Sequence, residues 1–234
     1  MKRQQTPTRA SIGAARFGPA AALLLAVPAA QASQPTFNGA DTAWLLISTV
    51  LVMLMTIPGI ILFYGGMLRT KNSLSIIAHT IAGSAMVTLV WAGIGYSLAF
   101  GNGTPWLGDL SRVFGAGLIG SGVVAHPAAP TVPEPAFFMY ELAFAIVTFS
   151  IILGATAERM RLGATVLFAA LWSALVYAPV ARWVWQPGGW LQAMGHMDFA
   201  GGTVVHIASG VSGLVAAWVP VSYTHLTLPT KRIV

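Results

Sequence analysis

The sequence predicts an all-α integral membrane protein. Of its 234 residues, 56% are hydrophobic and only 8% are charged, whereas a soluble domain carries about 25% charged residues. Five apolar runs follow one another, and each is long enough to cross a hydrocarbon core of about 30 Å as a helix. Helices are the expected form because lipid offers no partners for unpaired backbone groups.

Residues 1–32 are predicted to be a secretory signal peptide. Cations within residues 2–16 precede an apolar run over residues 17–30, and an A-x-A cleavage pattern ends at Ala32. The alternative is a first membrane helix, but the run is short for a span of about 20 residues. Cleavage after Ala32 would leave the mature N-terminus on the periplasmic or extracellular side.

The five predicted spans are almost free of charge. Four contain no Asp, Glu, Lys or Arg, and the third contains only Glu141. They cover residues 42–64, 74–100, 136–157, 162–181 and 199–219. Pro58 is expected to kink the first span, because proline removes a helical hydrogen bond and crowds the preceding turn.

The loops predict the orientation. The loop after the first span carries Arg69 and Lys71, and the loop after the third carries Arg159 and Arg161. Loops enriched in Lys and Arg are cytoplasmic, so the N-terminus is expected outside. The net charge of +6 comes largely from the N-terminal segment and indicates no nucleic-acid partner. The absence of cysteine excludes disulfides and thiolate metal sites.

Asp198 and His206 place ionisable groups in the fifth apolar run, where such groups usually mark a substrate or proton path. Asp198 is expected to cap the helix by accepting hydrogen bonds from the amides around residues 201 and 202, and to bias the outer mouth toward cations. His206 is expected two turns deeper on roughly the same helix face. It is either a packing residue, or a group that passes a proton or lines a pore.

Aromatic residues form a second candidate group. Tyr140 and Phe144 are four residues apart, hence on one face of the third span, and Trp185 lies at the outer end of the fourth. They form either an interfacial belt or, if their faces gather around one point, a cation–π site for a small cation. Glu141 is expected to face the outer vestibule or to pair with a neighbouring helix. No H-E-x-x-H or comparable spacing indicates a metal or an enzyme.

Several collinear motifs extend over residues 41 to about 219. They are D-T-A-W at 41–44, M-T-I-P-G at 55–59, L-F-Y-G-G-M at 62–67, R-T-K-N at 69–72, G-Y-S-L-A-F-G at 95–101, G-A-T-A-E-R-M-R at 154–161 and the stretch 198–206. The sequence thereby resembles the ammonium transporter family (Amt/Mep, related to Rhesus proteins). The resemblance implies that residues 33–220 form one five-helix repeat of an eleven-helix fold that assembles as a homotrimer.

The resemblance also implies a function and a site. It implies passage of ammonium or ammonia across the cytoplasmic membrane for nitrogen uptake, without a cofactor and with a possible cytoplasmic regulator of the PII type. Trp185, Phe144, Tyr140 and Asp198 would form the external cation site, although the family often has Phe at the Tyr140 position and Gln at the Glu141 position. Phe144 and His206 would line an apolar pore in which the cation loses its proton. A sensor or signalling protein on the same scaffold is the alternative.

Residues 221–234 do not resemble the family and are predicted to be a foreign, artefactual tail on a truncated reading frame. The resemblance assigns a second pore histidine, a second gate phenylalanine and a serine of the external site to the other half of the fold. The 234-residue chain is therefore expected to be a fragment that, expressed alone, neither conducts nor forms a stable trimer.

Overall fold

The computed structural model describes residues 37–120 and 122–224. The predicted signal peptide and residues 225–234 of the predicted tail lie outside this part of the chain. Within it, five helical stretches are long and apolar enough to cross a membrane, as the sequence predicts. They are Gly39–Met67, Thr70–Phe100, Glu134–Thr156, Leu162–Ala193 and Gly202–Val219.

Most of these stretches consist of several consecutive elements. The first contains α1 (Gly39–Leu54), η2 (Met55–Ile60) and α2 (Ile61–Met67), and the second contains η3 (Thr70–Asn72), α3 (Ser73–Val90), η4 (Trp91–Gly95) and α4 (Tyr96–Phe100). The third is the uninterrupted α5 (Glu134–Thr156). The fourth contains α6 (Leu162–Trp172), η6 (Ser173–Tyr177), α7 (Ala178–Trp185) and α8 (Trp190–Ala193), and the last contains η7 (Gly202–Ile207) and α9 (Ala208–Thr224).

The segments η2, η4, η6 and η7 are π-helical. Pro58 lies inside η2, where the expected kink takes the form of a widened turn. Proline would crowd the carbonyl four residues earlier in a regular α-helix, and a π turn relieves that contact. Such turns are rare and are frequently found at functional sites.

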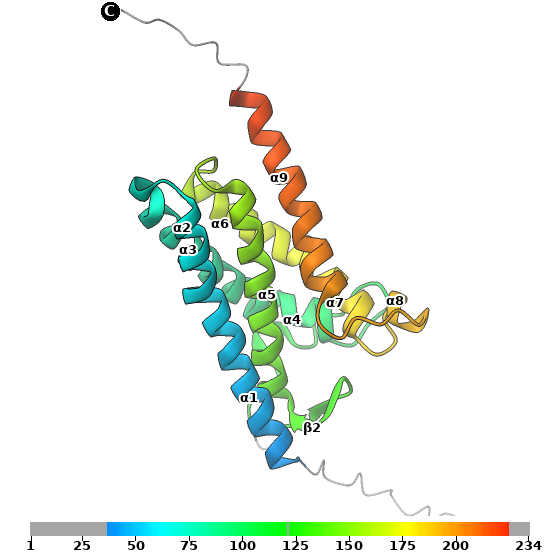
Figure 1. Ribbon diagram of the computed structural model, residues 1–234. Helices are drawn as coiled ribbons and strands as arrows, with labels where there is room; N and C mark the ends of the chain where they lie inside the picture. Colours follow the sequence, from blue (N-terminus) through cyan, green and yellow to red (C-terminus); the bar gives the residue numbers. More distant parts are fainter. Residues whose placement is uncertain (1–36, 121, 225–234) are drawn as a thin grey trace, which may run out of the picture. The chain divides into compact units, whose positions relative to one another are not determined.

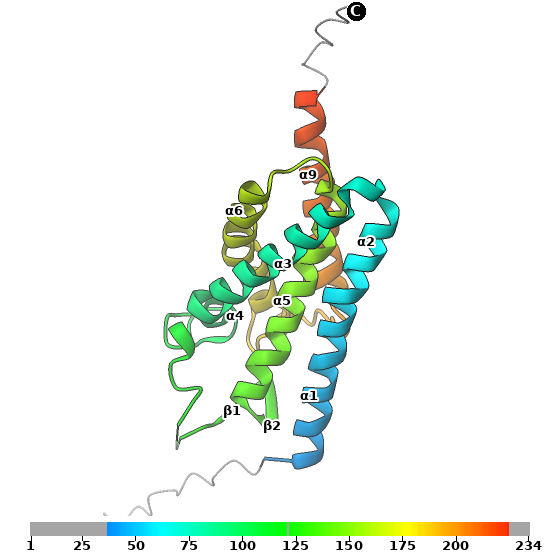
Figure 2. The same ribbon diagram turned by 90° about the vertical axis from the view of Figure 1, so that its left-hand side faces the viewer.

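Helix α5 is the centre of the bundle. It packs against α1, α3 and α9, and it runs beside α1 in both views (Figures 1 and 2). Phe149, Ile152 and Leu153 of α5 are almost completely buried. A helix that is apolar on all sides is expected to be surrounded by other elements, which explains why the third span forms the core.

Side chains from α7 fix the loop that follows α4. The buried guanidinium of Arg182 donates hydrogen bonds to the carbonyls of Ala99, Gly101 and Thr104. The indole of Trp183 donates to the Trp106 carbonyl over 2.8 Å. These contacts hold the connections after the second and fourth spans at the same end of the bundle.

The same connection contains η5 (Val113–Gly115) and a short antiparallel hairpin of β1 (Ala125–His126) and β2 (Ala129–Pro133). The amide of Asn38 donates to the Thr131 carbonyl over 2.8 Å, which attaches the start of α1 to β2. The N-terminal end of the first span therefore lies at the end of the bundle that carries the hairpin (Figure 1).

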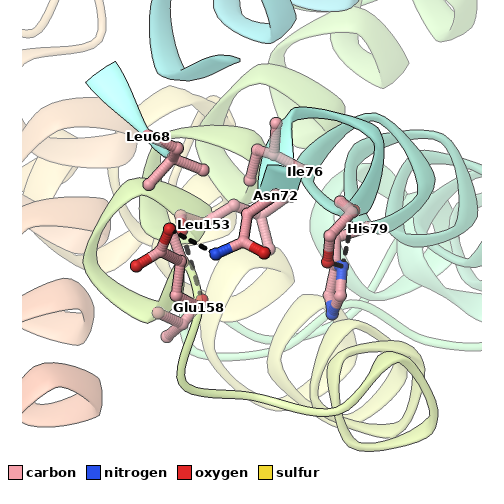
Figure 3. Close-up of a pocket in the computed structure, with 9 residues that line it drawn as sticks. Leu68, Asn72, Ile76, His79, Leu153 and Glu158 are labelled. Carbon is pink, nitrogen blue, oxygen red and sulfur yellow. Dashed lines mark hydrogen bonds between the residues drawn. The ribbon is translucent and has the colours of Figure 1, made fainter. Parts of the chain in front are cut away.

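The two basic loops meet at the other end of α5. The Asn72 amide donates to the Glu158 carboxylate over 2.6 Å, and His79 Nε2 lies 3.1 Å from the Met160 carbonyl oxygen. Figure 3 shows Asn72 directed at Glu158 beside His79. The hydrogen bond from Asn72 lowers the pKa of Glu158. The sequence predicts a cytoplasmic position for both loops, and the structure places them side by side.

Helix α9 continues to Thr224. Residues 221–224, predicted to belong to a tail distinct from the last span, therefore continue its helix. Their helical backbone needs no apolar side-chain pattern of its own, because a helix propagates by adding one hydrogen bond per residue.

Candidate functional site

Tyr140, Phe144 and Trp185 come together in the folded chain. The Phe144 and Trp185 ring centroids are 5.7 Å apart at 73°, and those of Tyr140 and Phe144 are 4.9 Å apart at 78°. Edge-to-face pairs of this kind are favoured by the ring quadrupoles. The three residues line one cavity of about 280 Å³, which we call the outer cavity after the side of the membrane on which the loop charges predict it.

The outer cavity is lined by ten residues of both polar and apolar character: Leu45, Ala128, Ala129, Phe137, Tyr140, Glu141, Phe144, Trp185, Asp198 and Phe199. Tyr140 and Phe144 are one turn apart on α5, and Trp185 is the last residue of α7. The Trp185 indole donates a hydrogen bond of 2.8 Å to the Asp198 carbonyl. This bond fixes the indole against the segment that leads into the last helix.

Asp198 caps the last helix more extensively than the sequence predicts. Its Oδ1 accepts from the Gly202 amide over 2.6 Å, and its Oδ2 accepts from the amides of Thr203 and Val204 over 2.8 and 3.0 Å. Gly201 precedes the helix with φ of +79°, a conformation that glycine adopts without steric cost. Both carboxylate oxygens of Asp198 are thus engaged by backbone donors.

His206 lies apart from the outer cavity. It lines a second cavity of about 470 Å³ with nine mostly apolar neighbours: Met55, Ile60, Phe63, Tyr64, Phe144, Val147, Ile151, Ala200 and Val205. We call this the histidine cavity. Phe144 is the one residue that lines both cavities.

The expectation that Asp198 and His206 share a helix face is wrong. Residues 198–201 are not helical, and the helix begins at Gly202 with a π-helical segment. Within that segment Val204 and Val205 are buried while His206 is exposed. The α-helical period of 3.6 residues therefore does not relate the two side chains, although they remain in the expected order along the chain.

Glu141 lines the outer cavity, and its position in an outer vestibule, the first of its two expected positions, stays a prediction. Its side chain is 6% exposed. The second expectation, a pair with a neighbouring helix, is not met within residues 37–120 and 122–224, where Oε2 has no hydrogen-bond partner and the ion pair present is that of Arg112 with Glu134.

Several residues at and around the outer cavity were not predicted from the sequence. Leu45 comes from α1, Ala128 and Ala129 from the hairpin, and Phe199 from the segment before the last helix. No local signal separates these apolar side chains from others in the chain, because their position follows from how α1 and the hairpin pack on α5.

Glu134 is a second buried acid, and its role was not predicted from the sequence. Glu134 is 1% exposed, and it accepts from the Tyr96 hydroxyl over 3.0 Å and from the Arg112 guanidinium over 2.8 Å. Both of its oxygens are satisfied, as a buried carboxylate requires. Glu134 therefore has a structural role: it fixes the loop around Arg112 to the start of α5.

The five membrane-length helices make this a multi-pass membrane protein. A sequence profile of the Ammonium Transporter Family matches residues 43–221. The chain therefore belongs to this family.

Relatives and solved structures agree with this assignment. The chain is 50% identical over 177 residues to the ammonium transporter of Bacillus subtilis (strain 168), covering 76% of this chain and 43% of that protein. It matches the crystal structure of Saccharomyces cerevisiae Mep2 with a TM-score of 0.70 and 35% identity, over 79% of this chain and 41% of that one. A solved structure described as a sensor Amt protein matches with a TM-score of 0.61 and 27% identity, over 71% of this chain and 40% of that one. The chain thus spans less than half the length of each.

Proposed function

We propose that this chain forms the outer recognition site and part of the conduction path of a protein that carries ammonium or ammonia across the cytoplasmic membrane. The observation that carries the proposal is the position of Phe144. Its ring lines both the outer cavity, with Trp185 and Asp198, and the histidine cavity, with His206. A gathering site and an apolar passage are therefore adjacent, with one aromatic ring between them.

The chemistry of the outer cavity suits a small cation. Indole and phenyl faces attract a cation that has lost part of its hydration shell, and the charge of Asp198 adds to this attraction. In the proposal Trp185, Phe144 and Tyr140 hold ammonium at the mouth. Asp198 also maintains the start of η7 through its three backbone hydrogen bonds, and thereby the placement of His206.

The histidine cavity suits a neutral species better than a cation. A bare ion in an apolar environment suffers a large desolvation penalty, and burial therefore favours loss of the ammonium proton. Neutral imidazole offers one donor and one acceptor. In the proposal His206 hydrogen-bonds ammonia in this passage and relays the proton, jointly with a second histidine that the family resemblance assigns to the other half of the fold.

The proposal includes an outward N-terminus, a homotrimer and a cytoplasmic regulator of the PII type. The two basic loops meet through Asn72 and Glu158, which supports a common cytoplasmic position for both. In the proposal they form the surface that such a regulator would contact. Exposed apolar residues on α1 and α9, including Trp44 and Leu214, support burial of these faces by lipid or by further protein. Because such faces are uncovered, we expect the 234-residue chain expressed alone to transport nothing.

The test is a chimaera in which residues 1–220 replace the matching part of the Bacillus subtilis transporter, expressed in cells that lack ammonium uptake. We expect the chimaera to take up labelled methylammonium, Trp185→Leu to raise the half-saturating concentration, and His206→Ala to abolish uptake. The 234-residue chain alone is the matched control. Uptake that is indifferent to both substitutions would disprove the proposed path.

A sensor is the second candidate, favoured by the similarity to the sensor Amt protein. The two candidates differ in turnover. If this chain belongs to a sensor, it binds methylammonium at the outer cavity without transporting it. The chimaera that carries residues 1–220 then gives no uptake, even with Trp185 and His206 intact. Robust uptake by the unsubstituted chimaera would therefore reject the sensor.

A further inference from the structure

We propose that Glu141 is a direct ligand of the cation in the outer cavity and a determinant of its selectivity; this inference rests on the proposed function. It follows from a difference between the two carboxylates that line the cavity. Asp198 has both oxygens occupied by three backbone amides. Glu141 lines the same cavity and forms no hydrogen bond through its side chain within residues 37–120 and 122–224. Its Oε2 is buried, so a cation in the cavity reaches the group at Oε1.

The chain offers a matched comparison in its other buried acid. Glu134 and Glu141 lie two turns apart on α5 and are 1% and 6% exposed. Glu134 has a hydroxyl donor from Tyr96 and a guanidinium donor from Arg112. Buried polar groups in folded proteins are almost always satisfied, and a buried group that lacks its partner requires a specific explanation. At Glu141 a cation that binds Oε1 from the cavity compensates the charge that both oxygens of the carboxylate share.

The cavity lining defines which donor fits. Two carboxylates line it, those of Glu141 and Asp198. The other lining side chains carry a phenol hydroxyl, an indole or only apolar groups, and none is Lys or Arg. A cation that carries N–H groups supplies both the positive charge and the hydrogen donors that the carboxylate lacks. Tyr140, Phe144 and Trp185 then face its remaining surface, where ring faces attract positive charge without accepting a conventional hydrogen bond.

Selectivity follows from this division of roles. Aromatic faces alone attract any small cation, including quaternary ammonium. A carboxylate adds charge-assisted hydrogen bonds, which are about twice as strong as neutral ones, and only to cations with N–H donors. Glu141 therefore favours ammonium and methylammonium over tetramethylammonium, which offers no N–H group.

The experiment measures cation binding to the chimaera, in which residues 1–220 replace the matching part of the Bacillus subtilis transporter, in phosphatidylcholine nanodiscs. Labelled methylammonium is the probe, and tetramethylammonium is the competitor without N–H donors. Glu141→Gln keeps the shape and one acceptor but removes the charge. We expect the dissociation constant for methylammonium to rise about tenfold and the preference over tetramethylammonium to fall several-fold. Glu141→Asp, which keeps the charge, should bind better than Glu141→Gln.

Controls separate this role from stability and from the proposed function. Glu158→Gln, just beyond the opposite end of α5, should bind as the unsubstituted chimaera does. Thermal unfolding of Glu141→Gln should be unchanged or shifted upward, because a buried carboxylate without a partner is destabilising; a downward shift would indicate a structural role and overturn the inference.

Three binding outcomes are decisive. If Trp185→Leu weakens binding while Glu141→Gln does not, the inference fails and the proposed function stands. If Glu141→Gln weakens both cations equally, direct hydrogen bonding is overturned. If the unsubstituted chimaera binds no methylammonium, the proposed recognition site fails, and this inference with it.

Discussion

The cap formed by Asp198 provides the sharpest test of how the site is held. Asp198→Ala removes the acceptors of three amides, at Gly202, Thr203 and Val204. Val204 is fully buried, so water cannot replace the bond to its amide, and an unsatisfied buried donor costs about 1–3 kcal/mol. The more accessible amides of Gly202 and Thr203 can be hydrated. With about 1 kcal/mol for the lost cap added to this, we expect a total of about 2–4 kcal/mol.

Asp198→Asn is the matched variant. Its amide oxygen can still accept from the amides of Thr203 and Val204, while the Gly202 amide is left to water. The loss of negative charge at a helix N-terminus costs about 0.3–1 kcal/mol. We therefore expect Asn to destabilise the start of η7 by about 1 kcal/mol, well below the effect of Ala.

Hydrogen exchange of the chain in nanodiscs measures this local effect. Because 1.4 kcal/mol corresponds to a factor of about ten, exchange of amides in residues 202–207 should accelerate roughly 100-fold in Asp198→Ala and about five- to tenfold in Asp198→Asn. Amides in the middle of α5 should keep their rates. Equal effects of Ala and Asn, or acceleration throughout α5, would refute the assignment of Asp198 as a local cap.

Three further changes test packing, protonation and loop anchoring. A Cβ at Gly83 would clash with Cε1 of the buried Phe149, so Gly83→Ala should lower the free energy of unfolding by about 1–3 kcal/mol. Gly66→Ala, with nothing within 4 Å of its Cβ, should not lower it, and equal melting temperatures of the two variants would contradict this. Burial lowers the pKa of His126. Below a pH of about 6.5 the unfolded chain therefore binds more protons than the folded chain, and the free energy of unfolding decreases as the pH decreases. His126→Gln should flatten this pH dependence of stability between pH 7 and 5. Arg182→Met removes the donors to three carbonyls, and amides in residues 101–109 should exchange at least tenfold faster, with Arg159→Met as the unaffected control.

The helical class and the five spans could be predicted from sequence because the bilayer imposes one length and one backbone solution. The elements within the spans could not. Pro58 indicates a distortion in the first span, but η4 contains no proline and η7 begins after Gly201 with no proline nearby. The position of a π-helical turn depends on how the neighbouring helices pack, and the local sequence does not specify that packing.

The gathering of the aromatic rings was predicted only through the family resemblance. Helical spacing places Tyr140 beside Phe144, but Trp185 reaches Phe144 because α7 ends where its indole can bond the Asp198 carbonyl. His126 illustrates the same limit. Its Nδ1 accepts from the Ala128 amide over 3.1 Å, its Nε2 lies 3.0 Å from the Phe100 carbonyl, and its ring stacks on Phe137 at 4.8 Å. In the sequence it is an ordinary loop histidine.

Asp198 and His206 follow one another along the chain in the predicted order, although they do not share a helix face as predicted. Sequence spacing places both residues on one face of a continuous helix, but the chain turns at Gly201 and begins the helix with a π-helical segment. Asp198 therefore lines one cavity and His206 another. What connects them is Phe144, a residue of α5 that no spacing rule within the last span would identify. The carboxylate caps the start of the segment that carries the imidazole, and in the proposed path the substrate passes Phe144 between the two cavities.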